Sequence, residues 1–188
     1  MKHKFLKSVA GLAMFASAFA FAQTPYPTKP ITMIVPFAAG GPTDTVARLV
    51  AQSMGNTLKQ TVLVENVGGA GGTIGAARVA KSAPDGYTLF LHHIGQSTAP
   101  SLYRKLSYNA VDDFEPIGLI TDVPMTFIAR GDFPAKDLKE LLAYVKANKS
   151  KVTYANAGVG SASHLCGMLF MTAIDTCLLY TSPSPRDS

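Results

Sequence analysis

The chain has 188 residues, of which 47% are hydrophobic and 15% are charged, with 16 Gly and 12 Pro. This composition is that of a globular protein, and it excludes a collagen-like chain and an intrinsically disordered chain of low hydrophobicity. The formal net charge of +5 would suit an acidic partner, but most of the excess positive charge lies at the N-terminus.

The first 22 residues have the pattern of a secretory signal peptide. Three lysines lie within the first seven residues, an uncharged apolar run covers Ser8–Ala22, and this run ends in the small-residue sequence Ala20-Phe21-Ala22. The run is shorter than the ~20 residues that span a bilayer. We therefore expect cleavage after Ala22, export to the periplasm and no stable membrane insertion.

Removal of residues 1–22 also removes three lysines and lowers the net charge from +5 to +2. The remaining chain has no stripe of Lys and Arg with interleaved aromatic residues, which is the pattern that nucleic-acid binding requires. We expect no nucleic-acid partner.

From residue 31 onward, short β-branched runs alternate with segments of helical periodicity. The predicted strands are 31–36, 61–65, 87–91, 114–121 and 152–155, with a further extended run at 125–129. The predicted helices are 42–58, 74–81, 99–104, 138–147 and 161–173. This alternation predicts an α/β fold with βαβ units and mostly parallel sheets. Such sheets bind ligands beyond the carboxyl ends of their strands.

The loop after the first strand is rich in glycine and opens a helix. Pro42 suits the first helical position, Gly41 the N-cap, and Asp44 a position near the third helical residue. Gly40 and Gly41 would let a ligand approach the backbone closely, and the free N–H groups of the helix would attract an anion. A well-capped helix start explains the same residues equally well, so both interpretations stay open.

Two further glycine-rich segments follow later strands. Gly68–Gly75 fails the dinucleotide-binding pattern G-x-G-x-x-G, because Ile74 occupies the last glycine position. We expect a tight turn with close backbone packing there. The segment 156–164 places Ser161 as an N-cap, with His164 one turn into the helix. Two such loops on separate strands would suit a carboxylate ligand held between them.

Two catalytic or metal-binding alternatives have weaker support. Ser161 with His164 and Asp44 would form a hydrolytic triad, but the chain has no G-x-S-x-G motif. His92–His93 with Cys166 would form a metal site, but neighbouring strand residues face opposite ways and no ligand spacing is present. We expect neither an enzyme nor a metal site.

The C-terminal residues 177–188 have a different character from the rest of the chain. Their sequence CLLYTSPSPRDS resembles the translation of a transposase adapter used to prepare sequencing libraries. We predict that this tail is foreign to the natural protein, and the fold prediction therefore leaves it out.

Four motifs in order resemble one known family. They are YPTKPITMIVPFAAGGPTDTVAR, VENVGGAGGTIGAARVAKSAPDGYTL, SLYRKLSYNAVDDFEPIGLI and VTYANAGVGSASHL. The chain resembles the Bug receptors, also called the TctC family, which are substrate-binding proteins of tripartite tricarboxylate transporters in Gram-negative bacteria. The resemblance implies a periplasmic binding protein-like fold of type II, a Venus flytrap with two α/β lobes, and a small organic acid bound between the lobes.

The resemblance also implies which residues bind the ligand. Backbone groups and waters of one loop would hold a carboxylate, the loop of the other lobe would close over it, and Ser97 would line the cleft. The implied binding residues are Phe37, Ala38, Gly40, Gly41, Thr43, Asp44, Ser97, Ala157, Gly158, Gly160, Ser161 and His164. No cofactor is implied. The partners would be the membrane subunits of a tripartite transporter, the receptor would be a monomer, and a sensor that docks a membrane signalling partner is the alternative function.

Family length and motif order divide the chain into four parts. Residues 1–22 are the predicted signal peptide, 23–123 the first α/β lobe, 124–176 the start of the second α/β lobe, and 177–188 the predicted foreign tail. The hinge is expected near Asp122–Pro124. Because family members are about twice as long as residues 23–176, we expect the second lobe to be incomplete in this chain.

Overall fold

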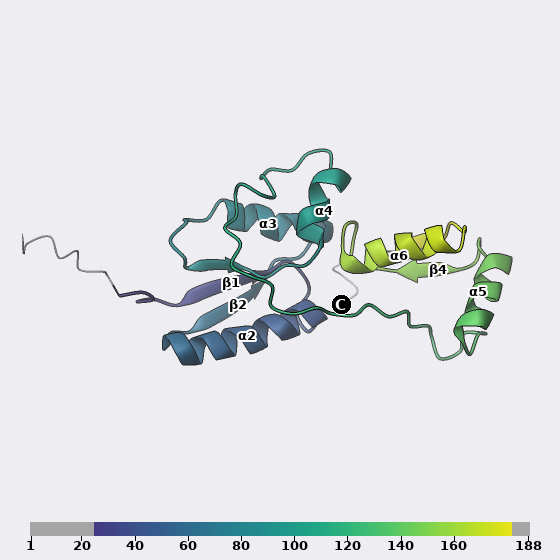
Figure 1. The fold of residues 1–188 in the computed structure, drawn as a ribbon, viewed down its shortest axis with the longest axis horizontal. Helices are drawn as coiled ribbons and strands as arrows, with labels where there is room; N and C mark the ends of the chain where they lie inside the picture. Colours follow the sequence, from purple (N-terminus) through teal and green to yellow (C-terminus); the bar gives the residue numbers. More distant parts are fainter. Residues whose placement is uncertain (1–24, 182–188) are drawn as a thin grey trace, which may run out of the picture.

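The computed structural model describes residues 25–181, which form two groups of α/β elements joined by a long connection (Figure 1). The first group contains β1 (Ile31–Val35), α2 (Pro42–Leu58), β2 (Val62–Asn66), α3 (Thr73–Ala80), β3 (Thr88–Phe90) and α4 (Gly95–Leu102). The second contains α5 (Leu138–Ala147), β4 (Thr153–Ala155), α6 (Ala162–Ala173) and β5 (Leu179–Thr181). The predicted signal peptide lies outside the described residues.

The first lobe is built on a parallel sheet with the strand order β2-β1-β3. β1 is central and buried on both faces, as its Ile-Thr-Met-Ile-Val sequence favours. Helix α2 covers one face, where Val46, Val50 and Met54 pack against Met33 and Val35. Helix α3 lies over the other face (Figure 1). The carboxyl ends of all three strands therefore meet at one edge of the sheet, as the alternating pattern predicted.

The second lobe has a smaller core of Val145, Ile174 and Leu178 beside the parallel pair β4–β5. Leu178 and β5 fall within the predicted foreign tail, which the fold prediction left out. The run Leu178-Leu179-Tyr180 is apolar, and it supplies hydrogen-bond partners to an edge of β4 that would otherwise be open. A short apolar segment of any origin can do this, so the foreign origin of 177–188 stays a prediction.

The predicted strand at 114–121 is wrong. Residues 115–130 have no regular secondary structure in the described part of the chain, and Ile117 and Leu119 are 86% and 83% exposed. A strand requires a neighbour to complete its hydrogen-bond ladder, and no described strand lies alongside this segment. The segment instead connects the two lobes (Figure 1), and the hinge near Asp122–Pro124 stays a prediction.

Across residues 25–181, every helix is too short or too polar to cross a bilayer.

Candidate functional site

The loop between β1 and α2 is a glycine turn followed by a capped helix start. Gly41 is the N-cap and Pro42 occupies the first helical position, as predicted. Gly40 has φ of +80°, which favours glycine, and a Cβ atom built on it would meet nothing within 4 Å. The Gly40 N–H donates to Asp44 Oδ2 at 2.8 Å. Because the protein's own carboxylate accepts this N–H, the capping interpretation holds for this donor.

Asp44 is the centre of a buried polar network behind that loop. Its side chain is 2% exposed and accepts from Arg48 Nε at 2.8 Å and from Asn66 Nδ2 at 3.0 Å. The hydrogen bond from Arg48 and then that from Gly40 lower the Asp44 pKa to about 2, against the opposing effect of burial. Asn66 also donates to the Phe37 carbonyl at 3.0 Å. The ionised carboxylate therefore ties the loop to both α2 and β2.

The loop before α6 in the second lobe repeats this arrangement. Ser161 is the N-cap, and its Oγ accepts from the His164 N–H at 3.2 Å, which confirms the predicted cap. His164 Nδ1 in turn accepts the N–H of Gly160 at 3.3 Å. In both lobes the glycine before the N-cap has positive φ and donates to the third residue of the helix, Asp44 or His164. We call this hydrogen bond, Gly40 to Asp44 in the first lobe and Gly160 to His164 in the second, the glycine brace.

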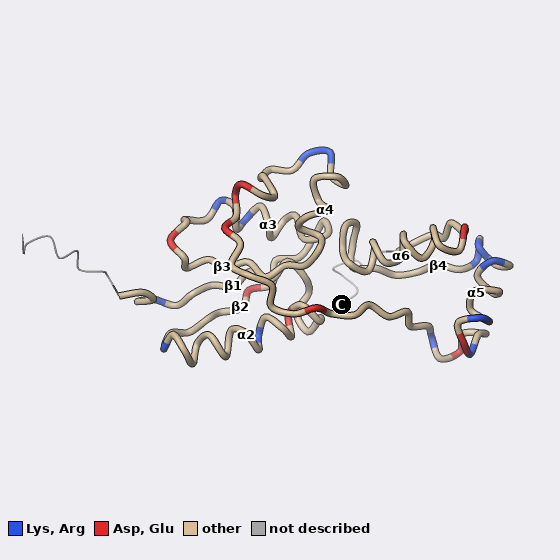
Figure 2. Tube along the Cα trace, viewed as in Figure 1, with Lys and Arg blue, Asp and Glu red and all other residues tan. Residues whose placement is uncertain are grey.

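Only a few N–H groups at the starts of α2 and α6 are open to a ligand. The first N–H groups of an α-helix have no partner within the helix. In α2 the first position is Pro42, so Thr43 and Asp44 carry the open donors; in α6 they are Ala162 and Ser163. Neither loop contains Lys or Arg (Figure 2). Attraction of an anion to these loops therefore depends on backbone N–H groups and the helix dipole.

The other predicted residues of the two loops differ in accessibility. Ala38, Gly40 and Ala157 are exposed, Phe37, Gly41, Thr43 and Gly158 are half-buried, and Gly160, Ser161 and His164 are buried. The Gly158 N–H donates to Asn156 Oδ1 at 2.9 Å and the Ala157 N–H to Ser163 Oγ at 3.0 Å. The buried members support the loop from within, and the exposed backbone is the part that a ligand can reach.

Ser97 lies in the first turn of α4, which begins at Gly95 rather than near residue 99 as predicted. Local sequence did not indicate this start, because the N-cap Ile94 has no capping side chain. Pro100, which usually ends a helix, lies inside this one. Ser97 is exposed, and its hydroxyl donates to the Ile94 carbonyl at 2.9 Å. The Ser97 hydroxyl proton is therefore already used in a hydrogen bond to the N-cap residue of α4.

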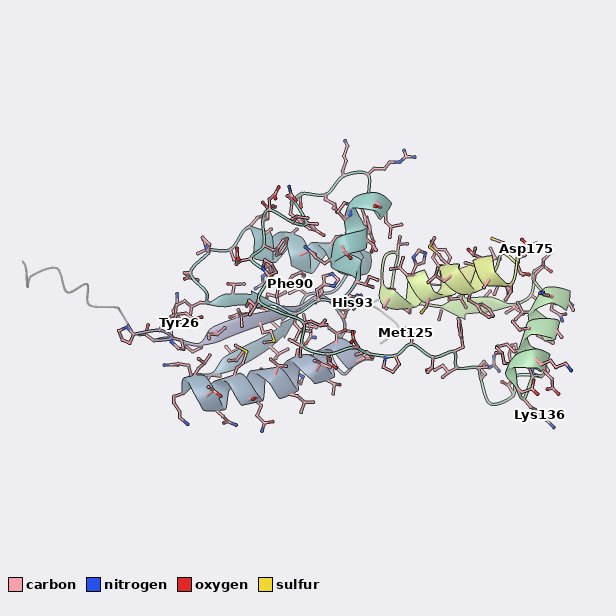
Figure 3. All side chains as sticks on the ribbon, in the orientation of Figure 1. Tyr26, Phe90, His93, Met125, Lys136 and Asp175 are labelled. Atoms are coloured by element: carbon pink, nitrogen blue, oxygen red, sulfur yellow. The ribbon has the colours of Figure 1, made fainter. Side chains whose placement is uncertain are left out.

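The two histidines after β3 form an aromatic wall that the sequence analysis missed. β3 ends at Phe90, so His92 and His93 do not face opposite ways as a continued strand would require, and their ring centroids lie 5.0 Å apart. The His93 ring stacks on Phe37 at 4.3 Å and lies at the end of the first lobe that faces the second (Figure 3). Among the described residues, no cluster of three or more His, Cys, Asp or Glu side chains could hold a metal ion.

Both histidines are held in the neutral state. Burial, and to a smaller extent the neighbouring His93, lower the His92 pKa to about 3, and burial lowers the His93 pKa. His92 Nδ1 accepts the His93 N–H at 2.7 Å, and His93 Nδ1 accepts the Gly95 N–H at 3.2 Å. The remaining nitrogen of each neutral ring, Nε2, therefore carries the proton and acts as a hydrogen-bond donor.

The structure does not form the proposed hydrolytic triad. The Ser161 hydroxyl contacts the backbone N–H of His164 and the Ser163 hydroxyl at 3.1 Å, rather than an imidazole nitrogen. The His164 Nδ1 atom is occupied by Gly160, and Asp44 is paired with Arg48 and Asn66. Two shallow surface hollows in the described residues lie away from both loops, one between α2 and β2 and one beside α3.

The two parallel sheets, each with a braced glycine loop beyond its strands, define a two-lobed α/β binding protein. The family model for the tripartite tricarboxylate transporter family receptor, TctC, matches residues 46–181. The chain belongs to this family, which confirms the resemblance seen in its motifs.

Individual relatives agree with this assignment. A UPF0065 protein from the TAR-I ttuE-ttuC′ intergenic region of Agrobacterium vitis is 56% identical over 82% of this chain and 45% of its own length. The solved structure of the periplasmic binding protein BugD is 58% identical, has a TM-score of 0.81, and covers 84% of this chain and 52% of its own. MatC from Rhodopseudomonas palustris, solved with bound malate, is 42% identical with a TM-score of 0.79, over 86% and 55% of the two chains.

These neighbours confirm the predicted periplasmic binding protein fold. The chain spans about half the length of the relatives that it matches. Measurements of stability and binding are therefore best made in the full-length protein.

Asn66→Ala tests the polar network around Asp44 that holds the first loop. The substitution removes the donor shared by the Phe37 carbonyl and Asp44 Oδ1 and leaves both acceptors short of a partner. Such a loss costs about 1–3 kcal/mol. We expect the free energy of unfolding, measured with urea, to fall by this amount. Asn56→Ala, on the same lobe but without such bonds, is the control; equal losses in the two variants would contradict the network's structural role.

His92→Gln tests the burial of a neutral histidine. Because the folded pKa of about 3 lies below the unfolded value of 6.5, the fold binds fewer protons than the unfolded chain. The stabilisation is complete above pH 6.5 and is lost as the pH falls toward 3. This single group accounts for about 3 kcal/mol between pH 7 and pH 4. We expect urea titrations of the variant to show a shallower decrease in stability over that range, and a decrease identical to wild type would contradict the assignment.

Proposed function

We propose that the full-length protein is a periplasmic receptor that binds a small organic acid between its two lobes and delivers it to the membrane subunits of a tripartite transporter. The observation that carries the proposal is the pair of braced glycine loops, each followed by open helix N–H groups at the start of α2 and of α6. Membership of the receptor family and the malate bound to MatC support the same function. In this proposal the protein binds and releases its ligand unchanged, as a monomer and without a cofactor.

We further propose that a ligand carboxylate binds at α6 rather than at α2. The start of α2 already holds the ionised carboxylate of Asp44, and a second carboxylate there would be repelled. The start of α6 holds an imidazole instead, and the N–H groups of Ala162 and Ser163 are open. The stacked rings of Phe37 and His93 would then form the wall of the first lobe beside the rest of the ligand.

Ala162→Pro tests this binding mode by removing one open donor. Proline is tolerated at the first helical position, and the extended conformation of Ser161 suits a following proline. Hydrogen bonds to charged groups contribute about 1.5–3 kcal/mol, and about 1.4 kcal/mol is one decade of affinity. We expect calorimetry to show malate binding weakened at least about tenfold.

Ala162→Ser keeps the N–H and is the matched control, for which we expect affinity within about twofold of wild type. The diamide of malate should bind much more weakly than malate to wild type. Unchanged affinity in Ala162→Pro, or equal affinity for acid and diamide, would place the carboxylate elsewhere.

The localisation follows from residues 1–22, whose basic head and apolar run we propose to direct export. N-terminal sequencing of the mature protein should give Gln23 as the first residue. A protein that retains Met1 in the cell would contradict periplasmic export.

A further inference from the structure

The two lobes touch through a hydrogen bond whose two partners are not among the proposed ligand-binding residues. Tyr103 follows the last turn of α4 in the first lobe, and its hydroxyl donates to the Val159 carbonyl at 2.6 Å. Val159 lies in the loop before α6, 56 residues further along the chain, and Figure 1 shows this loop facing α4. Tyr103 is half-buried, and burial raises its pKa, so the hydroxyl keeps its proton at neutral pH.

Missing side chains let the backbones of the two lobes approach at this point. Gly71 has φ of +63°, and a Cβ atom at this position would clash with the Val159 oxygen and lie 2.7 Å from the Tyr103 hydroxyl. A Cβ atom on Gly95 would lie 3.0 Å from the Gly160 oxygen, and one on Gly160 would lie 3.3 Å from Leu102. The Val159 carbonyl therefore lies between Gly71 and the Tyr103 hydroxyl, an arrangement that we call the Val159 socket. Any side chain larger than hydrogen at position 71 would displace the carbonyl.

This socket acts on the loop that carries the open N–H groups. Val159 directly precedes Gly160, whose N–H is held by His164, and the N-cap Ser161 follows. A shift of the Val159 carbonyl would move the start of α6 relative to the first lobe. Because the Tyr103–Val159 bond exists only when the lobes meet, it adds its free energy to the closed arrangement alone.

We propose that Tyr103 is a positioning residue that holds the ligand-binding loop of the second lobe against the first, so that the closed receptor releases its ligand slowly. This inference rests on the proposed function for the role of closure, while the contact itself can be measured without ligand.

The first experiment compares Tyr103→Phe with wild type in the full-length, ligand-free protein by hydrogen–deuterium exchange. We expect two- to tenfold faster exchange in peptides that cover residues 157–164, the range that corresponds to the loss of one neutral hydrogen bond. Tyr108→Phe is the matched control, because the buried Tyr108 hydroxyl has no hydrogen-bond partner among the described residues. We expect its exchange over 157–164 to equal that of wild type.

The second experiment measures malate kinetics by stopped flow. Loss of the contact should raise the dissociation rate constant two- to tenfold in Tyr103→Phe and leave the association rate constant within about twofold, since the open state is unaltered. Gly71→Ala should act in the same direction, and the double variant should be no worse than Gly71→Ala alone, because both changes release the same carbonyl.

The outcomes separate the two proposals. Wild-type exchange and wild-type dissociation in Tyr103→Phe would overturn the positioning role even if malate binds normally. Faster exchange in Tyr103→Phe would support the contact, and if wild type then bound neither malate nor other small carboxylates, the proposed function would fail while the contact stood.

Discussion

The hydrogen bond between a left-handed glycine and the third residue of the following helix is the interaction on which both candidate binding loops depend. Gly40 donates to Asp44 in the first lobe, and Gly160 donates to His164 in the second. Each bond pairs the N–H of the residue before the N-cap and fixes the direction of its peptide. The chain can thus present a few backbone N–H groups in a fixed position without using a charged side chain. Rigid donors of this kind reduce the entropic cost of binding an anion.

The two loops share a geometry but differ in charge. Asp44 is ionised, buried and paired with Arg48. Its negative charge already compensates the positive end of the α2 helix dipole. The corresponding position of α6 holds the imidazole of His164, and the first turn of α6 contains no Asp or Glu to compensate the helix dipole. In the proposed binding mode, this asymmetry would give an anionic ligand a preferred orientation. The contact between Tyr103 and Val159 joins the loop before α6 to the first lobe.

The sequence predicted the features that depend on local signals. Both ends of α2 and of α5 agree with the prediction. The capping residues and the amphipathic spacing that determine these ends lie within or next to each helix in the sequence. The strand at 114–121 was wrong because a strand depends on a partner that no local pattern reveals. Two contacts join residues far apart in the sequence: Asn66 and Asp44 are separated by 22 residues, and Tyr103 and Val159 by 56. Hydrophobic periodicity does not predict such contacts. The position of Asn66, directly after the predicted strand at 61–65, was a signal that could have been used.

Titration of the full-length, ¹⁵N-labelled protein with malate, followed by amide NMR, tests the central claim most directly. A carboxylate that accepts hydrogen bonds from the start of α6 should shift the amide proton signals of Ala162 and Ser163 strongly downfield, and the diamide of malate should not. The account predicts that these two shifts saturate together with the binding isotherm. Saturable binding that leaves the Ala162 and Ser163 signals in place would contradict it.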